Sequence, residues 1–277
     1  MKKHSLFLLA LTYRFFYKVN RFLFLRKKRP LKHSKLIVVG AYLIGGAGKT
    51  PFTLHLAQHF LSENKSVAIL CHAKANDEFL WLQQKLPHVK VFKTKNRASL
   101  ASRLDGQFDV ILTDDGFEDH RLVPDEKIAL QWGESTHYIR DLIPLGPCRS
   151  LKRDHLDITR TVFCGNSFIN PDLLFLISKT ANASGELLNT GATAMCGIGA
   201  PQRFFSDLEK FGAIIHKRVE RPDHDRRFET HLKKELSLSN PIVITEKDFS
   251  RLSPEIRNNP LLFMAEQKVA ILSRSIS

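Results

Sequence analysis

The sequence has few cysteines, no acidic residue near its N-terminus and no run of about twenty apolar residues, the length that a membrane-spanning helix needs. Its four cysteines lie far apart and form no C-x-x-C pair, so neither a zinc site nor a dithiol redox motif is indicated. We interpret them as reduced cytosolic thiols. Low-complexity linkers and internal repeats are also missing, while a hydrophobic content of 43% is enough for a buried core. The 277 residues therefore predict one large or two modest folded domains.

Basic charge is concentrated at the N-terminus. The formal net charge is +14, and eleven Lys and Arg residues, with no Asp or Glu among them, precede Leu36. The other 31 basic residues are offset by 28 acidic ones, so the remaining 242 residues carry only +3. Nucleic-acid enzymes usually spread basic residues over a binding face, whereas a basic, aromatic segment suits an anionic membrane surface. We therefore expect a membrane surface as a partner, and no nucleic acid.

Residues 1–31 are predicted to form an amphipathic helix that associates with a membrane. The apolar run Leu6 to Leu11 is too short to span a bilayer. Three basic residues share one helical face and three apolar residues share another: Arg14, Lys18 and Arg21, and Phe16, Val19 and Leu23. A cleaved signal peptide is disfavoured, because Tyr13 and Arg14 stand where small cleavage-site residues should follow. A helix that packs its aromatic face on the domain itself is the alternative.

The stretch VVGAYLIGGAGKTPF, residues 38–52, is similar to a phosphate-binding loop, although Leu43 stands where the usual G-x-x-x-x-G-K-[ST] pattern has glycine. A strand is predicted before it at 35–40, and apolar residues recur at helical spacing after it, at Phe52, Leu56 and Phe60. In such an arrangement backbone N–H groups and a helix N-terminus bind phosphate. The predicted nucleotide contacts are Gly45, Gly46, Ala47, Gly48, Lys49 and Thr50. A glycine-rich turn before an ordinary helix is the alternative.

A second apolar strand, residues 110–112, leads into Asp114 and Asp115. Enzymes with a phosphate-binding loop hold Mg²⁺ with acidic residues at the carboxyl end of such a strand. We therefore predict Mg²⁺ binding by these two aspartates together with the Thr50 hydroxyl. An Asp-Asp-Gly turn without metal is the alternative.

Six motifs follow one another along the chain: GGAGKTP, ILTDDGF, LIPLGPCR, CGIGAPQRFF, RPDH and VITEKD. Their order and approximate spacing resemble those of the tetraacyldisaccharide 4′-kinase family, the lipid A 4′-kinases of Gram-negative bacteria, which also tolerates a residue other than glycine at Leu43. The resemblance implies a lipid kinase that uses ATP and Mg²⁺ to phosphorylate the 4′-hydroxyl of a tetraacyldisaccharide 1-phosphate. It places an acylated glucosamine disaccharide substrate at the cytoplasmic face of the bacterial inner membrane, with no obligate protein partner evident.

The same resemblance assigns roles to individual residues. Asp77, in ANDEFLWL, matches an aspartate that acts on the acceptor hydroxyl, and His224, in RPDH, matches the histidine that partners it. Such a carboxylate can accept the hydroxyl proton while the imidazole orients it and balances its charge. The implied catalytic residues are Asp77, His224 and Lys49, the metal residues are Thr50, Asp114 and Asp115, and Arg97 joins the nucleotide contacts. The alternatives are a helix cap for Asp77, a solvated loop histidine for His224, a surface charge for Arg97 and a strand-to-helix cap for TEKD.

Several polar positions depart from the family pattern. The arginine- and glycine-rich SRGYGG stretch is missing, because SVAILCHAKANDEF joins the second strand almost directly to the Asp77 segment. Ala41 replaces an asparagine, Glu118 and Asp119 replace an amide and an imidazole, and Ser150 replaces a metal-proximal glutamate. These changes should slow phosphoryl transfer more than they weaken the fold. A catalytically weakened or altered-substrate kinase, a membrane-associated P-loop ATPase and a non-catalytic adaptor are the alternatives.

The predicted fold class is α/β. Residues 32–162 are expected to form a kinase core like that of P-loop NTPases, with a parallel sheet covered by helices on both faces. Residues 163–277 are expected to form a smaller α/β domain whose last residues return to the core. If Asp77 belongs to the first domain and His224 to the second, catalysis requires domain closure.

Overall fold

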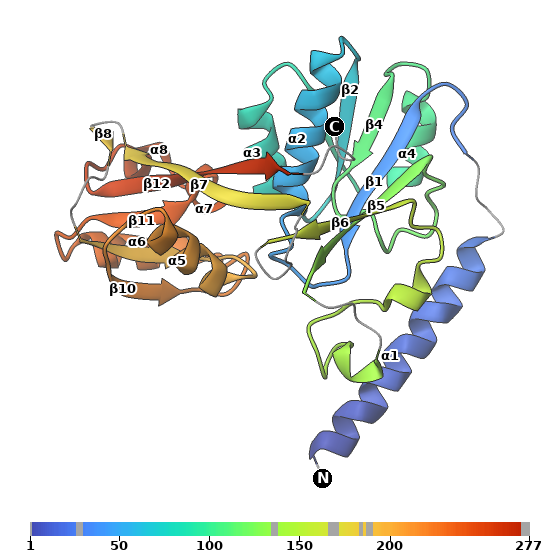
Figure 1. The fold of residues 1–277 in the computed structure, drawn as a ribbon, viewed down its shortest axis with the longest axis horizontal. Coiled ribbons are helices and arrows are strands. Elements are labelled where there is room, and N and C mark those ends of the chain that lie inside the picture. The colour runs from blue at the N-terminus through green and yellow to red at the C-terminus, as the bar shows by residue number, and fades with distance from the viewer. Residues whose placement is uncertain are drawn as a thin grey trace. The chain divides into compact units, whose positions relative to one another are not determined.

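The computed structural model describes residues 2–25, 30–133, 138–165, 172–182, 185–186 and 191–272 (Figure 1). The chain divides into two compact units. Unit 1 consists of Met1–Ala75, Leu86–Leu174 and Ile271–Ser277, and unit 2 consists of Asn76–Lys85 and Phe175–Ala270.

Unit 1 is built on a parallel sheet. Its helices are α1 (Lys2–Leu25), α2 (Lys49–Ser62) and α4 (Arg97–Leu104), with the short 3-10 helices η1 (Ile139–Asp141) and η2 (Lys152–Asp154). Its strands are β1 (Lys35–Ala41), β2 (Val67–His72), β3 (Lys90–Thr94), β4 (Val110–Thr113), β5 (Glu126–Trp132) and β6 (Arg160–Cys164). They lie in the order β6-β5-β1-β4-β2-β3, with parallel pairing throughout. From Leu36 to Ala41 the central strand β1 is apolar and buried, because both faces of a parallel sheet are covered.

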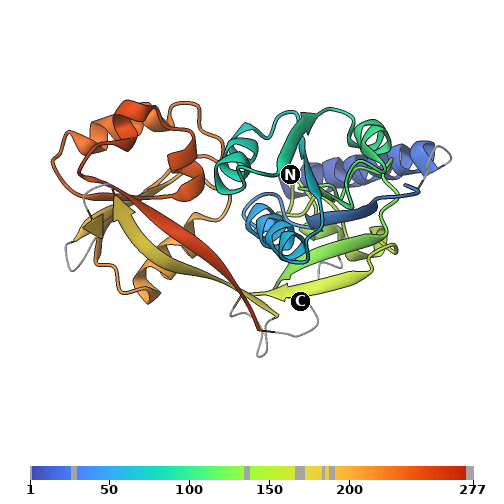
Figure 2. The ribbon, with the colours of Figure 1, turned by 90° about the horizontal axis from the view of Figure 1, so that it is seen from above.

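Helices cover both faces of this sheet. On one face Ala101 and Leu104 of α4 pack in a single cluster with Leu36 and Val38 of β1. Phe52 of α2 is fully buried, and Figure 2 shows α2 and α4 on opposite sides of the strands. The predicted P-loop NTPase-like sheet with helices on both faces is confirmed, and the carboxyl ends of β1 and β4 come together where the phosphate site was expected.

Helix α1 packs on unit 1 through only part of its surface. Ala10 and Tyr17 are buried, and Arg14 forms an ion pair of 3.1 Å with Asp154. The aromatic side chains of α1 divide between two sides of the helix: Tyr17 packs on unit 1, as the alternative predicted, whereas Phe16 is 63% exposed. No helix among the described residues combines the length and apolarity that crossing a bilayer would require.

Unit 2 is a smaller α/β unit, as predicted. Its strands are β7 (Leu173–Asn182), β8 (Gly185–Glu186), β9 (Ala192–Cys196), β10 (Ile215–Glu220), β11 (Ile242–Thr245) and β12 (Leu262–Ile271), of which β7 and β12 each have one end in unit 1. Its helices are α3 (Asn76–Lys85), α5 (Pro201–Lys210), α6 (Phe228–Leu236), α7 (Glu246–Ser250) and α8 (Pro254–Arg257). The strand order is β10-β9-β11-β12-β7, with β8 beside β7. Phe205 of α5 and Phe228 of α6 belong to separate apolar clusters that include β9 and β11.

The division between the units differs from the predicted ranges in two places. Helix α3 lies inside the predicted core range 32–162 but belongs to unit 2, because its charged side chains pair there. Lys85 pairs with Glu246, and Glu78 lies 2.9 Å from Lys247. Unit 1 also extends past residue 162 to include β6 and the start of β7. Residues 273–277, predicted to return to the core, lie outside the described residues.

Candidate active site

The loop between β1 and α2 has the backbone of a phosphate-binding loop. Gly45, Gly46 and Gly48 have φ angles of 66°, 60° and 76°, a left-handed conformation that glycine adopts without strain. The N-cap residue of α2 is Gly48, which has no side chain to cap the first turn, and a helix N-terminus of this kind favours an anion. Trp132, at the end of β5, donates an indole hydrogen bond of 2.9 Å to the carbonyl of Ala47 and fixes the loop.

The structure explains why leucine stands at position 43. Leu43 forms an antiparallel bridge with Cys148, and the Ile44 N–H donates a 2.9 Å bond to the Pro147 carbonyl. Leu43 and Ile44 do not have the left-handed backbone conformation, so position 43 does not require glycine. The Leu43 side chain instead packs on a small buried cluster of Leu142, Cys148 and Leu151. The bridge between Leu43 and Cys148 holds the Gly-Pro-Cys-Arg motif, residues 146–149, beside the phosphate-binding loop. Arg149 is thereby placed at the phosphate site.

Thr50 and Asp114 meet at the N-terminus of α2. The Thr50 hydroxyl donates a 2.9 Å hydrogen bond to Asp114, and the Thr53 hydroxyl donates one of 3.3 Å to the other carboxylate oxygen. A hydroxyl and a carboxylate offer the oxygen ligands that Mg²⁺ prefers, so these residues fit the ion. Within the described part of the chain no three His, Cys, Asp or Glu residues cluster as a metal site. Mg²⁺ sites of nucleotide-binding enzymes commonly combine one or two carboxylates with substrate phosphates and water.

Asp115 lies between two cations. One carboxylate oxygen is 3.5 Å from Lys49 Nζ, and the other accepts a 2.8 Å hydrogen bond from Arg149. Burial alone would raise the pKa of Asp115, but the Lys49 and Arg149 charges outweigh it and lower the pKa. Asp115 also has a φ of 55°, a strained value for a residue with a side chain. A phosphate group bound at this loop would meet the same two cations. Arg149 was not predicted as a site residue from the sequence, in which its position beside a Gly-Pro turn was the only indication of such a role.

Arg97 binds the backbone of the Asp114–Asp115 turn. It is 7% exposed and donates hydrogen bonds of 2.8 and 2.9 Å to the backbone carbonyls of Asp114 and Asp115. It also lies 3.4 Å from Asp119, one of the residues that departs from the family pattern. The surface-charge alternative is therefore wrong. Direct contact between Arg97 and a nucleotide stays a prediction.

Asp77 and His224 form a pair within unit 2. The predicted placement of Asp77 in the first domain, from which domain closure was expected, is therefore wrong. His224 Nδ1 lies 3.0 Å from the Asp77 carboxylate, and Arg251 lies 3.3 Å from the same oxygen. Burial would raise the pKa of Asp77, but the His224 hydrogen bond and the Arg251 charge together lower it. The hydrogen bond to Asp77 is the main cause of a raised pKa for His224. His224 is half-exposed with a φ of 59°, so a strained backbone presents its ring to solvent.

The TEKD motif supports this pair. Thr245 caps α7 by accepting a 3.1 Å hydrogen bond from the Asp248 N–H, as the cap alternative predicted. Asp248 is fully buried, pairs with Arg251 and accepts a 3.0 Å hydrogen bond from the Gly197 N–H. The motif therefore fixes Arg251 beside Asp77. Sequence reasoning missed Arg251, although its spacing of three from Asp248 on a helix was a usable signal.

Comparisons with known proteins point to one family. A sequence model of the family described as tetraacyldisaccharide-1-P 4′-kinase matches residues 3–72 and 71–275. Tetraacyldisaccharide 4′-kinase of Shewanella frigidimarina is 29% identical over 242 residues, which cover 77% of this chain and 71% of that relative. The protein of the same name from Ruthia magnifica is 28% identical over 273 residues, covering 87% and 83%. A crystal structure of LpxK from Aquifex aeolicus in complex with ATP is 21% identical, with a TM-score of 0.72 over 99% of this chain and 96% of that one, and shows the same fold. Because the family model spans almost the whole sequence, this chain belongs to the tetraacyldisaccharide-1-P 4′-kinase family.

Proposed function

We propose that this protein transfers the γ-phosphoryl group of ATP to the 4′-hydroxyl of a tetraacyldisaccharide 1-phosphate, a step of lipid A biosynthesis. The observation that carries the proposal is the hydrogen bond between Asp77 and a half-exposed His224 in a chain that also has a phosphate-binding loop. An ATPase needs only the loop, whereas transfer to an alcohol also benefits from a base for the hydroxyl proton.

Each group has a distinct role in the proposed reaction. Lys49 and Arg149 bind the phosphates, and Thr50 and Asp114 would hold Mg²⁺, which supplies positive charge to the phosphate oxygens. Asp77 accepts the proton of the acceptor hydroxyl as that oxygen bonds to the γ-phosphorus and ADP leaves. His224 orients the Asp77 carboxylate.

The proposed substrate is a lipid, and α1 offers a surface that suits a membrane. One side of α1 carries large apolar side chains that are more than half exposed: Leu8, Leu9, Phe15, Phe16, Phe22 and Leu23. An apolar face beside excess basic charge is typical of helices that lie in the interface of anionic bilayers. We assign the protein to the cytoplasmic face of the inner membrane, because ATP is available on that side.

The test is transfer of ³²P from Mg-ATP to a tetraacyldisaccharide 1-phosphate in mixed micelles. We expect Lys49→Ala to lower the rate about 10²- to 10³-fold, because the charge on the transferred group is no longer neutralised. Asp77→Asn should lower it about 10²-fold or more, because the proton acceptor is lost. Lys65→Ala is the matched control for Lys49→Ala, because Lys65 is an exposed lysine. Asp207→Asn is the matched control for Asp77→Asn, because Asp207 is an aspartate of helix α5.

Two results separate this function from its rivals. If folded protein hydrolyses ATP at the same rate with and without lipid and phosphorylates no lipid, the kinase assignment fails and the P-loop ATPase replaces it. If the folded protein binds no nucleotide, the kinase assignment also fails and the protein is better described as a non-catalytic adaptor.

A further inference from the structure

Lys247, in the TEKD motif, binds two carboxylates from different parts of unit 2. It lies on α7, and its side chain is 24% exposed. Its ammonium nitrogen is 2.9 Å from Glu78 Oε1 and 3.2 Å from Asp223 Oδ1. Burial alone would lower the pKa of Lys247, but the charges of these two carboxylates outweigh it and raise the pKa. Lys247 is therefore held as a cation between them.

The same two carboxylate oxygens face the imidazole of His224. Nε2 of the ring is 3.7 Å from Glu78 Oε1 and 3.8 Å from Asp223 Oδ1, which is too long for a hydrogen bond. The other ring nitrogen, Nδ1, is 3.0 Å from Asp77. The imidazole thus has Asp77 on one side and, on the other, two carboxylates that are already bound to Lys247.

Lys247 also ties together the two segments that supply the pair. Glu78 is the neighbour of Asp77 on α3. Asp223 is the neighbour of His224 in the loop between β10 and α6. Because Lys247 contacts both neighbours, a single ammonium group on α7 fixes the spacing between α3 and the loop.

Charges from all three segments act on His224. Two carboxylates of α3, one carboxylate of the loop and two cations of α7 and its C-terminal end lie around the pair: Asp77, Glu78, Asp223, Lys247 and Arg251. The hydrogen bond to Asp77 is the main cause of the raised pKa of His224, and burial and the Lys247 charge oppose it. Three negative charges thus stand against two positive ones, and loss of Lys247 would leave only Arg251 to balance them.

We propose that Lys247 is a positioning residue for the Asp77–His224 pair. It holds the two carboxylates behind the ring and so keeps the imidazole directed at Asp77. The inference rests on the proposed role of this pair in lipid phosphorylation. Without the ammonium group, both carboxylates would attract the protonated Nε2, and a charge-assisted hydrogen bond there would draw the ring away from Asp77. The carboxylate that accepts the hydroxyl proton would then lose its orientation.

The first test is the NMR titration of His224 in the full-length protein with isotope-labelled histidine. The resonance that is missing from His224→Gln identifies the residue. Lys247→Met, a side chain of similar size without charge, should move the midpoint of this titration to higher pH, because two carboxylates are no longer neutralised. Lys247→Arg keeps the charge and should restore the wild-type midpoint. A midpoint in Lys247→Met that equals the wild-type value or lies below it overturns the proposal.

The second test asks whether removal of a freed carboxylate repairs the loss of Lys247. In the ³²P assay Lys247→Met should lower kcat about tenfold and leave the KM for ATP unchanged, because only the orientation of the pair is affected. The double variant Lys247→Met with Glu78→Gln restores the excess of one negative charge and should recover both the midpoint and most of the rate. A defect of the same size in the double variant would show that Lys247 only supports the fold, and the proposal would be wrong.

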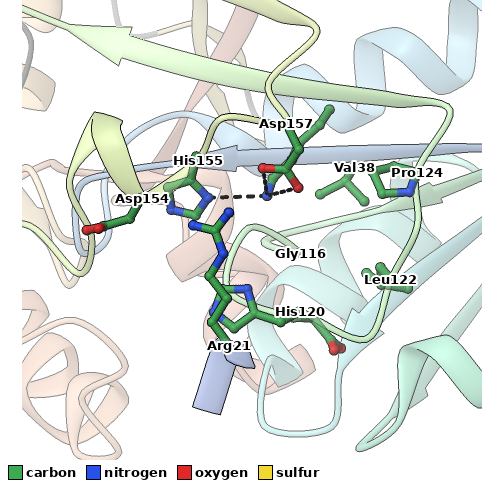
Figure 3. Close-up of a pocket in the computed structure, with 11 residues that line it drawn as sticks. Arg21, Val38, Gly116, His120, Leu122, Pro124, Asp154, His155 and Asp157 are labelled. Atoms are coloured by element: carbon green, nitrogen blue, oxygen red, sulfur yellow. Dashed lines mark hydrogen bonds and ion pairs between the residues drawn. The ribbon is translucent and has the colours of Figure 1, made fainter. Parts of the chain in front are cut away.

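Lys127→Met is the matched control. Lys127 is a buried lysine of unit 1 that also contacts a carboxylate and a histidine. Its Nζ lies 3.2 Å from His155 Nδ1 and from the Asp157 oxygens, the interactions that Figure 3 marks with dashed lines. The control also removes a paired ammonium group but should leave the His224 midpoint at its wild-type value. An equal shift in the control overturns the proposal, because the midpoint would then not depend on the groups beside His224.

If Lys247→Met does not fold, Glu78→Gln is compared with the double variant instead. Removal of Lys247 should raise the His224 midpoint in that background too, since Asp223 is still freed, and equal midpoints overturn the proposal. The titration needs neither ATP nor lipid. A shifted midpoint in a protein that phosphorylates no lipid therefore counts against the proposed function and not against the role of Lys247.

Discussion

At the scale of single residues, Asp115 and His224 have positive φ values although neither is glycine. Their φ angles are 55° and 59°, and such a conformation costs about 1 to 3 kcal/mol each. Strain of this kind persists where surrounding contacts hold it, and both side chains are in ion pairs with other predicted site residues. Asn64 and Ser239 have the same conformation, so it is the ion pairs together with the strained backbone that distinguish Asp115 and His224.

A substitution at His224 should separate activity from stability. Asparagine tolerates the left-handed conformation, so His224→Asn should change the free energy of unfolding by less than about 1 kcal/mol. The same change removes the imidazole that orients Asp77, and lipid phosphorylation should fall about 10²-fold. Chemical denaturation and the ³²P assay measure the two effects. A variant that is fully active would show that His224 has no part in the reaction.

The Asp77–His224 pair should also depend on pH in a defined window. The hydrogen bond to Asp77 raises the pKa of His224 above 6.5, so its stabilisation is complete below that pH and is lost as pH rises through the raised value. The pKa of Asp77 is lowered from 3.8, so its contribution is lost only below that value. The difference in thermal midpoint between wild type and His224→Gln should therefore be largest from about pH 4 to about pH 6.5 and should shrink at higher pH. A difference that stays constant up to about pH 9 would contradict the assigned pair.

At the scale of elements, the unit that binds phosphate was readable because its signals are local. The β-branched run of β1, the glycines that follow it and the apolar spacing of α2 lie within one continuous stretch. The pairing of Thr50 with Asp114 followed from the rule that strand carboxyl ends meet at one edge of a parallel sheet.

Other elements depended on contacts between distant parts of the sequence, which no local pattern encodes. Helix α3 belongs to unit 2 because Asp77 meets Arg251, 174 positions away. Arg149 reaches the phosphate site because Leu43 pairs with Cys148. Neither arginine was identified as a site residue from the sequence.

Two tyrosine hydroxyls help to attach helix α1 to unit 1, and their contribution can be measured. Tyr17 is buried, with its hydroxyl 3.2 Å from His155 Nε2, and Tyr13 donates a 2.8 Å hydrogen bond to the Arg149 carbonyl. Tyr17→Phe and Tyr13→Phe should each lower the free energy of unfolding by about 1 kcal/mol, because each removes one hydrogen bond. Phe16→Leu, on the exposed side, should leave it unchanged. Urea titrations measure these free energies. If the two tyrosine variants were as stable as Phe16→Leu, α1 would not pack as described.

At the scale of the whole molecule, charge and exposed apolar surface are concentrated in the same segment. The first 35 residues contain eleven Lys and Arg and no acidic residue, while the other 242 are close to neutral at +3. Each basic residue near an anionic bilayer contributes about 1 kcal/mol, and this attraction weakens as salt screens it. Membrane attachment should therefore be governed by the N-terminal segment and not by the net charge of the folded units.

Binding to vesicles tests this separation directly. We expect affinity for vesicles that contain phosphatidylglycerol to fall steeply between about 0.1 and about 0.5 M salt. Phe16→Ser and Phe22→Ser should each weaken binding about tenfold, because an exposed phenyl ring that enters the interface contributes about 1.5 to 3 kcal/mol when buried. Phe211→Ser is the matched control, since Phe211 is exposed on unit 2. Sedimentation with the vesicles gives the affinity. If Phe211→Ser weakened binding as much as the two α1 variants, attachment would not be specific to the N-terminal helix, and the charge asymmetry would need another explanation.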